Sequence, residues 1–391
     1  MRITFLAGCL EPGKDGVGDY TRILAEECTR LGAACQTIAL ADRHAPGMTT
    51  SQASGVETLR LPGRLPWPSR VEAARRATGR FAPDWASVQF VPYSFHRLGI
   101  ATRLVRALPR LVGPARLHVM FHEIWIGPDG SWRRRLVSGA QRRCVLRLCR
   151  YPETLMHTSN SAYEEILKAH GVAARPLPLF GNIPVATTDG WNWLAPQLAA
   201  VGCDAAVRRG GWWLFVLFGA LHPCWPPEPL FERLQDAAAE AGRRMALISV
   251  GRLAGGDELW RTIEARYAAH FPILRLGEQP DGRVSEVLKA ADFGVATSPY
   301  WLLDKSGTAI AMLEHGLPVI VNREDGPTPP SDDDAWPEAG RVIRLDSDFA
   351  RRLREARRID PQPRRALVAA RFLADLKAFA PGETAGVPVV A

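Results

Sequence analysis

The sequence lacks any apolar run of the ~18–20 residues that a membrane-spanning helix needs. It opens directly on a strand-like run, MRITFLAGCL, so we expect no signal peptide. Its seven cysteines are scattered and form no CxxC pair, which argues against a disulfide framework or a zinc site and favours a reducing cytoplasm. The motifs GxSxG and HExxH are absent, and no His/Cys cluster has ligand spacing. We therefore expect a cytoplasmic protein with no metal site.

The composition is that of a soluble globular protein. The 391 residues suffice for two domains, and they are 47% hydrophobic and 23% charged. A formal charge of +8 favours anionic partners such as phosphates, nucleotides, anionic lipid or nucleic acid. A genome that encodes arginine often would give the same excess. Because no basic stripe is interleaved with aromatic residues, we do not expect nucleic acid as a partner.

Strand-like apolar runs alternate with segments of helical period along the whole chain. This alternation predicts an α/β fold with mostly parallel sheets and helices on both faces. The alternation of strand-like and helical segments is not clear between residues 184 and 210, and it resumes at RRGGWWLFVLFGA. We therefore predict an N-terminal domain at 1–185, a linker region at 186–210, a second domain at 211–360, and a C-terminal helix and tail at 361–391 that could cross back to the first domain.

A glycine-containing loop, GKDGVGDY at 13–20, follows the first predicted strand. Its glycines permit close backbone approach, and the N–H groups at the start of the next helix can face an anion or a sugar. Gly16, Val17 and Gly18 are the candidate binding residues. The loop matches neither GxGxxG nor a P-loop, and a plain turn between strand and helix is the alternative.

A histidine, His122, closes the predicted strand LHVMFHE. Ligands of parallel sheets bind beyond the carboxyl ends of the strands, where a histidine can donate a hydrogen bond or titrate near neutrality. The alternative is a structural histidine. His118, earlier in the same strand, is a better candidate for packing.

The segment 132–150, WRRRLVSGAQRRCVLRLCR, has helical period, seven arginines and no acidic residue. A basic amphipathic helix of this kind binds anionic membrane surfaces or other polyanions. A surface helix packed on its own domain is the alternative. If it binds lipid, the protein would lie at the inner membrane surface.

The stretch KSGTAIAMLEHGLP, 305–318, follows an apolar strand and ends before another, VIVN. This order of strand, turn, helix and strand is typical of α/β nucleotide sites. Lys305 could bind phosphate, and Ser306, Gly307 and Thr308 could supply backbone and hydroxyl donors. Glu314, about two turns later, could reach a ribose. An exposed helix cap with an incidental acid is the alternative.

Taken in order, these segments resemble the GT-B glycosyltransferases and, within them, the retaining family GT4. The resemblance covers roughly residues 1–345 and implies two Rossmann-like, doubly wound domains that face each other across a cleft. The first would bind the acceptor and the second a nucleotide-sugar donor, without a catalytic metal or a further cofactor. The segments that carry it are DGVGDYTRILAEECTRLG, VQFVPYSFHRLG, HEIW, TSNSAYEEIL, PLFGNIP and ADFGVATSPY…EHGLPVIV.

The resemblance also implies roles for single residues. Gly16 and Gly18 would approach the donor diphosphate and the acceptor, and His122 would hydrogen-bond the donor sugar. Glu314 matches the second glutamate of the E-x7-E signature, which holds the ribose.

The sequence departs from the family at two places. Ser306 stands where the first glutamate of the signature is expected. In the family, two basic residues after the first strand of the second domain neutralise the diphosphate. This chain has FGALHPCW there, 218–225, with no Arg or Lys. Lys305, Arg252 or His222 would take their place, and we predict Lys305.

The predicted function is therefore a retaining, metal-independent transfer of a hexosyl group from a UDP- or GDP-type sugar nucleotide. The acceptor would be a glycan, a glycolipid or a small molecule. A catalytically impaired binding or scaffolding protein with the same fold is the alternative.

Overall fold

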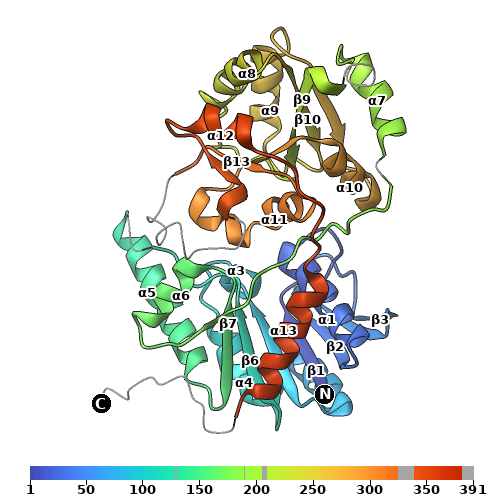
Figure 1. The fold of residues 1–391 in the computed structure, drawn as a ribbon. Coiled ribbons are helices and arrows are strands. Elements are labelled where there is room, and N and C mark those ends of the chain that lie inside the picture. The colour runs from blue at the N-terminus through green and yellow to red at the C-terminus, as the bar shows by residue number, and fades with distance from the viewer. Residues whose placement is uncertain (128–129, 189, 205–208, 325–338, 381–391) are drawn as a thin grey trace. The chain divides into compact units, whose positions relative to one another are not determined.

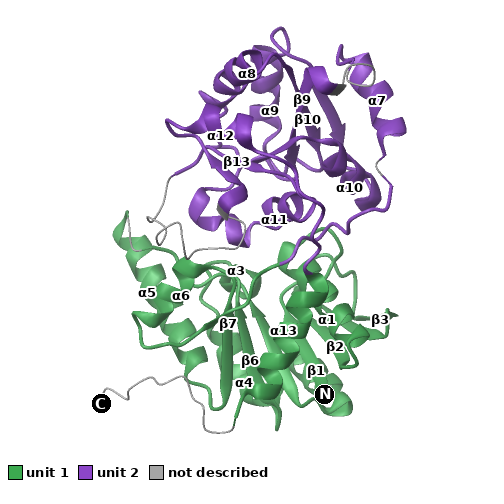
Figure 2. Cartoon of the chain, in the orientation of Figure 1, with its two compact units in different colours: residues 1–179, 365–391 green, residues 180–364 purple. Residues whose placement is uncertain are grey.

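In the computed structural model the chain forms two compact units (Figure 2). Unit 1 comprises residues 1–179 and 365–391, and unit 2 comprises residues 180–364. Within the described part of the chain, no helix has the length and apolar character that crossing a membrane requires. The structure describes residues 1–127, 130–188, 190–204, 209–324 and 339–380.

Unit 1 is built on a sheet with the strand order β3-β4-β2-β1-β5-β6-β7-β8 (Figure 1). Its pairs are parallel except the β3–β4 hairpin, which is antiparallel. The chain runs from β1 to β2 on one side and later to β5 on the other, so the order reverses at β1. The strands are β1 (Arg2–Ala7), β2 (Ala34–Asp42), β3 (Thr49–Ala53), β4 (Val56–Pro62), β5 (Trp85–Phe90), β6 (Arg116–Phe121), β7 (Thr154–Thr158) and β8 (Arg175–Pro176).

Helices cover this sheet, and the last of them returns from the far end of the chain. Helix α13 packs against α1, and its Phe372 ring lies 5.9 Å from the Phe5 ring of β1. Trp85 of β5 contacts Phe379 just beyond α13, with ring centroids 5.7 Å apart. The C-terminal segment therefore completes the core of unit 1. The helices are α1 (Gly16–Arg30), α2 (Trp67–Phe81), α3 (Pro92–Phe95), α4 (Thr102–Val112), α5 (Trp132–Cys149), α6 (Ser161–Lys168) and α13 (Arg365–Ala378).

Unit 2 has a parallel sheet with the order β11-β10-β9-β12-β13-β14. The order reverses at β9, between β10 and β12. Alternate side chains of β9 enter two separate apolar clusters, Leu214 and Val216 in one and Phe215 and Leu217 in the other. The strand is therefore buried on both faces, as its unbroken apolar run predicts. The strands are β9 (Trp212–Phe218), β10 (Arg244–Val250), β11 (Ile273–Gly277), β12 (Phe293–Ala296), β13 (Val319–Val321) and β14 (Val342–Arg344).

The helices of unit 2 form the two outer layers. Residues of α7, α10 and α11 share the cluster of Leu214, whereas residues of α8, α9 and α12 share the cluster of Phe215. This arrangement confirms the predicted α/β class with doubly wound parallel sheets. The helices are α7 (Trp191–Ala200), α8 (Leu230–Glu240), α9 (Asp257–Tyr267), α10 (Asp281–Ala290), α11 (Gly307–Glu314) and α12 (Phe349–Glu355), and the 3-10 segments are η1 (Arg209–Gly211), η2 (Tyr300–Lys305) and η3 (Ala339–Arg341).

The region 186–210 differs from its prediction as a linker. It contains α7, whose Leu194 and Leu198 are buried in the core of unit 2. The chain passes from one unit to the other at Phe180 and returns after Arg364. Of the region 186–210, residues 189 and 205–208 lie outside the described part of the chain.

Candidate functional site

Two glycine turns close the strand ends at the reversal point of unit 2. Gly219 follows β9 with φ +80°, and Gly251 follows β10 with φ +100°. A Cβ atom on Gly219 would lie 2.7 Å from Cγ2 of Thr308, and one on Gly251 would lie 3.1 Å from Cα of Gly219. Only glycine combines these positive φ angles with such close approach. The two turns therefore let the start of α11 lie directly against the end of β9.

Three hydroxyl groups gather at the start of α11. Ser306 is the N-cap, and its Oγ accepts from the backbone N–H of Ala309 at 3.4 Å. Ser298, just after β12, donates to Ser306 Oγ at 3.2 Å, and Thr308 Oγ1 lies 3.2 Å from the same oxygen. Serine is a favoured N-cap because its oxygen satisfies an N–H that the helix leaves unpaired. The residue that replaces the expected glutamate thus has a local structural role.

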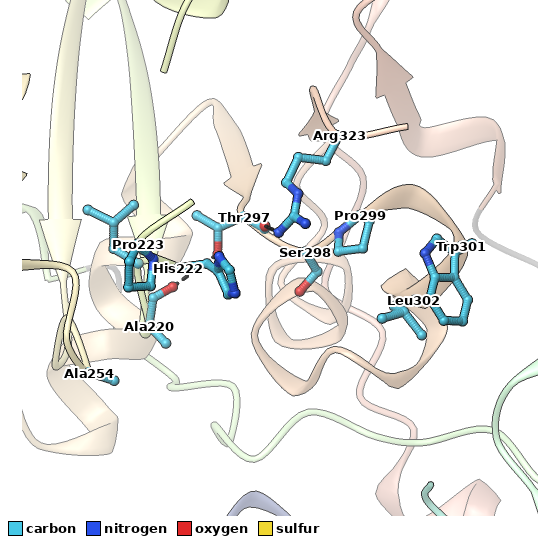
Figure 3. Close-up of a pocket in the computed structure, with 11 residues that line it drawn as sticks. Ala220, His222, Pro223, Ala254, Thr297, Ser298, Pro299, Trp301, Leu302 and Arg323 are labelled. Carbon is cyan, nitrogen blue, oxygen red and sulfur yellow. Dashed lines mark hydrogen bonds between the residues drawn. The ribbon is translucent and has the colours of Figure 1, made fainter. Parts of the chain in front are cut away.

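A pocket of about 530 Å³ opens beside this helix start (Figure 3). Thr297 Oγ1 donates to the carbonyl of Ala220 at 3.0 Å and so ties the end of β12 to the end of β9. Arg323 Nη1 donates to the carbonyl of Thr297 at 3.4 Å, which places the guanidinium at the pocket. The lining residues are Ala220, Leu221, His222, Pro223, Ala254, Thr297, Ser298, Pro299, Trp301, Leu302 and Arg323.

The pocket combines apolar walls with two groups that can bind an anion. The backbone N–H of Cys224 donates to Nδ1 of His222 at 3.1 Å, so a neutral imidazole carries its proton on Nε2. Arg323 adds a permanent positive charge, and Trp301 adds an aromatic surface. The sequence reasoning missed Arg323 and Trp301 as site residues. Arg323 directly follows the predicted strand VIVN. Because ligands of parallel sheets bind beyond the carboxyl ends of the strands, this position alone would have indicated Arg323 as a candidate.

The two cations predicted from the sequence lie elsewhere. Lys305 is the last residue of η2 and is half-buried, and it does not line the pocket. Arg252 follows β10, and its Nε lies 3.6 Å from Oε1 of exposed Glu278. This carboxylate partly offsets the charge of Arg252, and the pair is weak because both side chains are solvated. Arg323 lines the pocket, whereas Arg252 does not.

Glu314, the last residue of α11, is only 2% exposed. Its Oε1 accepts from the backbone N–H of Gly181 at 3.0 Å and lies 3.5 Å from Nε of Arg364. The backbone N–H of Gln362 donates to the carbonyl of Glu314 at 2.7 Å. Glu314 thus holds both the segment that enters unit 2 and the segment that leaves it. Its binding to ribose stays a prediction, and the structure adds this second role.

Unit 1 has its own pocket, of about 380 Å³, at the carboxyl ends of its central strands. Its lining mixes cationic or titratable groups with carboxylates, so it offers both donors and acceptors. A Cβ atom on Gly8 would lie 2.4 Å from Cβ of Ser94, which shows how closely α3 approaches the end of β1. The lining residues are Gly8, Cys9, Lys14, Asp15, Ala41, Arg43, His44, Val91, Tyr93, Ser94 and Glu123.

Asp42, at the end of β2, holds the loops around this pocket. It is 1% exposed and accepts from Arg60 Nε at 2.8 Å and from the backbone N–H groups of Leu10 and His44 at 3.2 and 2.9 Å. Burial alone would raise the pKa of this carboxyl group, but these donors lower the pKa to about 2. Asp42 is therefore a buried anion whose partners position two strand ends.

The glycine loop of unit 1 is arranged differently from its prediction. Helix α1 begins at Gly16, so Gly16, Val17 and Gly18 form its first turn. The N-cap Asp15 accepts from the backbone N–H of Gly18 at 2.7 Å. A Cβ atom on Gly18 would lie 2.5 Å from the carbonyl oxygen of Cys9, so a side chain at this position would clash with the backbone after β1. Ligand binding by Gly16, Val17 and Gly18 stays a prediction.

His122 follows β6 and is 5% exposed. Its Nε2 lies 2.9 Å from Oε1 of Gln89, and its ring meets the ring of Tyr20 edge-on at 5.1 Å. The neighbouring Glu123 lines the pocket of unit 1. The predicted position at a strand end is correct, and its role toward a donor sugar stays a prediction.

The predicted basic helix is α5, and it is only partly packed. Cys144, Val145 and Leu148 are buried, whereas Trp132 and Leu136 near its start are 67% and 65% exposed. A groove of about 730 Å³ between α4 and α5 is lined by Arg106, Arg143, Arg147 and Arg150 together with apolar side chains. The carboxyl-terminal half of the helix therefore fits the structural alternative, and the start does not.

No protein-family model matches the chain, and no curated protein matches it. Solved structures do match nearly all of it. Sucrose-phosphate synthase from Thermosynechococcus elongatus has 13% identity and a TM-score of 0.54, and the match covers 98% of this chain and 92% of that one. HepE from Anabaena, in complex with UDP-glucose, has 16% identity and a TM-score of 0.51 over 98% and 93% of the two chains.

A third similar structure is UDP-GlcNAc 2-epimerase from Neisseria meningitidis, bound to UDP-GlcNAc. It has 9% identity and a TM-score of 0.51, and the match covers 96% of this chain and all (100%) of that one. At these identities the likeness bears on architecture alone. Together with the two doubly wound parallel sheets, it shows that the chain has the GT-B fold.

Proposed function

We propose that the chain is a glycosyltransferase that takes its sugar from a nucleotide-diphosphate donor, as the GT4-type resemblance implies. The observation that carries the proposal is the pocket of unit 2 at the reversal point of the sheet. It joins Arg323 and His222 to the hydroxyl-lined start of α11, because Ser298 both lines the pocket and contacts Ser306. HepE, which has the same fold, is in complex with UDP-glucose, which favours a UDP-sugar as donor.

The residues suit the departure of a nucleoside diphosphate. Negative charge develops on the diphosphate as the glycosidic bond breaks, and fixed donors stabilise that charge. Arg323, His222 and the N–H groups at the start of α11 would supply those donors, with Lys305 as a further cation. Trp301 would lie against the base, and Glu314 and His122 keep their predicted roles toward the ribose and the sugar. Such a set works without a metal.

Retention of the anomeric configuration follows from the resemblance. In this mechanism the acceptor attacks from the face that the diphosphate leaves, and a diphosphate oxygen takes the acceptor proton. No side chain then needs to act as the base.

The donor assignment is tested by isothermal titration with UDP-, GDP- and dTDP-glucose. We expect one of the three to bind, and Arg323→Ala to weaken it about tenfold or more, because a charged hydrogen bond is worth about 1.5–3 kcal/mol. Arg351→Ala, which changes an exposed arginine of α12 in the same unit, is the matched control and should leave the affinity unchanged. Equal affinity in wild type and Arg323→Ala would sink the assignment of Arg323.

The products separate the proposed activity from its alternatives. A transferase releases the nucleoside diphosphate in step with glycosylation of an acceptor, and NMR of the product reports the anomeric configuration. An epimerase would instead change the configuration at C2 of the sugar. A binding or scaffolding protein would bind the donor without turnover, and that result would contradict an enzymatic function.

The pocket of unit 1 is the proposed acceptor site. Its mixture of Lys14, Arg43 and His44 with Asp15 and Glu123 suits a polyhydroxylated acceptor, since hydroxyl groups both donate and accept hydrogen bonds. The acceptor itself, whether glycan, glycolipid or small molecule, is found by screening for donor-dependent product with the wild-type chain.

We further propose that α5 binds an anionic membrane surface, which would favour a lipid-linked acceptor and a peripheral location at the cytoplasmic face. The specific observation is the exposure of Trp132 and Leu136 one turn apart beside Arg133, Arg134 and Arg135. Basic residues near an anionic leaflet contribute about 1 kcal/mol each, and an interfacial tryptophan adds apolar contact.

Vesicle flotation tests this membrane contact. We expect flotation with phosphatidylcholine vesicles that contain phosphatidylglycerol, and little with phosphatidylcholine alone. Trp132→Ala with Leu136→Ala should reduce flotation, whereas Leu367→Ala, an exposed leucine of α13, should not. Flotation that ignores lipid charge would overturn the electrostatic contact.

A further inference from the structure

The groove of about 730 Å³ between α4 and α5 is held by the packing of these two helices in unit 1. Thr102 Oγ1, at the start of α4, lies 3.3 Å from Sγ of Cys144 on α5. Leu108 of α4 and Leu148 of α5 are buried. The walls of the groove are therefore fixed by core side chains, and the groove does not depend on exposed loops.

Four arginines line this groove, and three of them form a row. Arg143 and Arg147 of α5 and Arg150 at its C-cap are spaced by four and three residues, which places them on one face of the helix. Arg106 lines the groove from α4. All four side chains are exposed, so a ligand in solution can reach them.

The four arginines have no counter-charge beside them. Neither α4 nor α5 contains an acidic residue, and no acidic residue is among the described residues that line the groove. Within the described part of the chain, the four guanidinium groups form no ion pair or hydrogen bond. Like charges one turn apart on a helix repel each other. The groove is therefore electrostatically unfavourable until an anion enters it.

The helix dipole explains only part of this cluster. A cation in the last turn of a helix is stabilised by the dipole, and this accounts for Arg147 and Arg150 at the end of α5. The effect falls off within one turn, so it does not account for Arg143 or Arg106. These two residues therefore provide the stronger evidence for a bound anion.

The number of guanidinium groups favours a phosphate over a carboxylate. Each guanidinium presents a planar fork of donors that fits either group. A phosphate monoester has nearly two negative charges at pH 7 and three acceptor oxygens, so it can engage arginines from both walls at once. A single carboxylate has one charge and two oxygens, which leaves most of the cluster unpaired.

The groove has room and apolar surface for more than a phosphate group. Its volume lies within the range of about 300–1,000 Å³ that small-molecule sites occupy. The arginines share the lining with an aromatic ring and several apolar side chains. These lining residues are Val105, Leu108, Pro109, Leu146, Tyr151 and Pro152.

We propose that the groove between α4 and α5 is a binding site for a small organic phosphate. The arginines bind its phosphate group, and its organic part lies on the apolar walls. A soluble molecule fits better than a lipid headgroup, because the site is a concavity between two helices, whereas a bilayer contacts side chains that protrude. The site is separate from the proposed donor pocket, whose lining residues all belong to unit 2.

Isothermal titration of the full chain in phosphate-free buffer tests the ligand class, with phenyl phosphate as the probe. We expect phenyl phosphate to bind, inorganic phosphate to bind more weakly because it lacks the organic part, and phenol to show no binding. Equal affinity for phenyl phosphate and inorganic phosphate would overturn the organic part of the proposal. No binding of either anion would overturn the site.

Variants locate the binding. Arg106→Ala with Arg143→Ala, the groove variant, should weaken phenyl phosphate about tenfold or more, because charged hydrogen bonds are lost from both walls. Arg110→Ala with Arg142→Ala is the matched control, since both arginines are exposed on the same helices and do not line the groove. Arg323→Ala should also leave this affinity unchanged. If Arg323→Ala removes the binding and the groove variant does not, the probe occupies the donor pocket and the proposal is wrong.

Thermal unfolding tests the repulsion between the arginines. Without a ligand, the groove variant should melt at the same temperature as the wild type or higher, because like charges have been removed. Phenyl phosphate should raise the melting temperature of the wild type and of the matched control, but not that of the groove variant. A lower melting temperature of the ligand-free groove variant would show that the arginines stabilise the fold themselves, against the proposal.

Flotation with vesicles of phosphatidylcholine and phosphatidic acid distinguishes the soluble ligand from a lipid. We expect the groove variant and the matched control to float equally, since both lose two positive charges. Selective loss of flotation in the groove variant, together with no binding of phenyl phosphate, would assign the groove to a lipid headgroup and overturn the soluble ligand. The donor titrations of the proposed function are unaffected by either result, so the two proposals fail separately.

Discussion

Replacing Asp42 by asparagine removes the buried charge that holds the loops around the pocket of unit 1. The carboxylate faces Arg60 Nε at 2.8 Å and two backbone N–H groups, and it is 1% exposed. Asparagine keeps the shape of the side chain and one acceptor oxygen but lacks the charge. The change therefore removes the charge together with the hydrogen bonds that one of the two carboxylate oxygens accepts.

The expected cost follows from the pKa of Asp42. Its pKa falls from an ordinary value of 3.8 to about 2 in the folded protein. Because one pKa unit corresponds to about 1.36 kcal/mol, the ionised group contributes about 2 kcal/mol to folding at neutral pH. The folded pKa is the lower one, so this contribution is fully present above about pH 4 and disappears as the pH falls toward 2.

Urea unfolding of the full chain at pH 7 and at about pH 2.5 measures this term. We expect Asp42→Asn to lower the free energy of unfolding by about 2 kcal/mol at pH 7, and this difference to shrink by more than half at the lower pH. Pulsed thiol labelling at pH 7 assigns the transition, since Cys35 lies on β2 of unit 1 and Cys203 is buried in unit 2.

The matched control is an ion pair on the surface of the same unit. Glu165 lies 3.4 Å from Lys168, and their side chains are 62% and 73% exposed. Glu165→Gln should therefore cost less than about 0.5 kcal/mol at either pH. A similarly small cost for Asp42→Asn at pH 7, or an undiminished cost at low pH, would refute the reasoning.

Two further changes probe the start and the end of α11. Gly181→Ala would place a Cβ atom 2.8 Å from Cα of Ala311, so we expect a loss of about 1–3 kcal/mol in thermal or urea unfolding. Gly282→Ala, whose Cβ atom meets nothing within 4 Å, should be neutral or stabilising, and an equal loss in both variants would contradict the steric reading. Ser306→Ala removes the N-cap and should cost about 1 kcal/mol in urea unfolding, and an unchanged midpoint would show that the cap carries no stability.

The fold was accessible from the sequence because its strands are short, wholly apolar runs between helical segments. The runs DFGVAT and PVIVN became β12 and β13, and the turn and helix between them became η2 and α11. The helix α7 was not recognised. Its short apolar face, Leu194 and Leu198, is interrupted by Pro196 and stands beside tryptophans, so no clear period is visible.

The site was less accessible because it depends on strand order and register. Arg323 comes 18 positions after Lys305, yet it reaches the pocket because β13 lies next to β12. His118 was expected to have a packing role. It is fully buried, and its two ring nitrogens form hydrogen bonds with Ser87 and His157. That contact requires β5, β6 and β7 to be neighbours in register, which local periodicity does not specify.

The two helix starts at the reversal points of the sheets differ in a way that bears on where a diphosphate would bind. Helix α1 is capped by the carboxylate of Asp15, which occupies the N–H of Gly18 with a negative charge. Helix α11 is capped by the neutral hydroxyl of Ser306. The positive end of a helix dipole attracts an anion, and a carboxylate already at that end offsets the attraction.

A diphosphate would therefore be repelled at the start of α1 and accepted at the start of α11, beside Arg323. The replacement of the expected glutamate by Ser306 favours this outcome, because a carboxylate at that helix start would have opposed the same anion. On electrostatic grounds the serine therefore supports the proposed binding of a diphosphate at this helix start. Recognition of the sugar then falls to other groups, of which His122 is the predicted one.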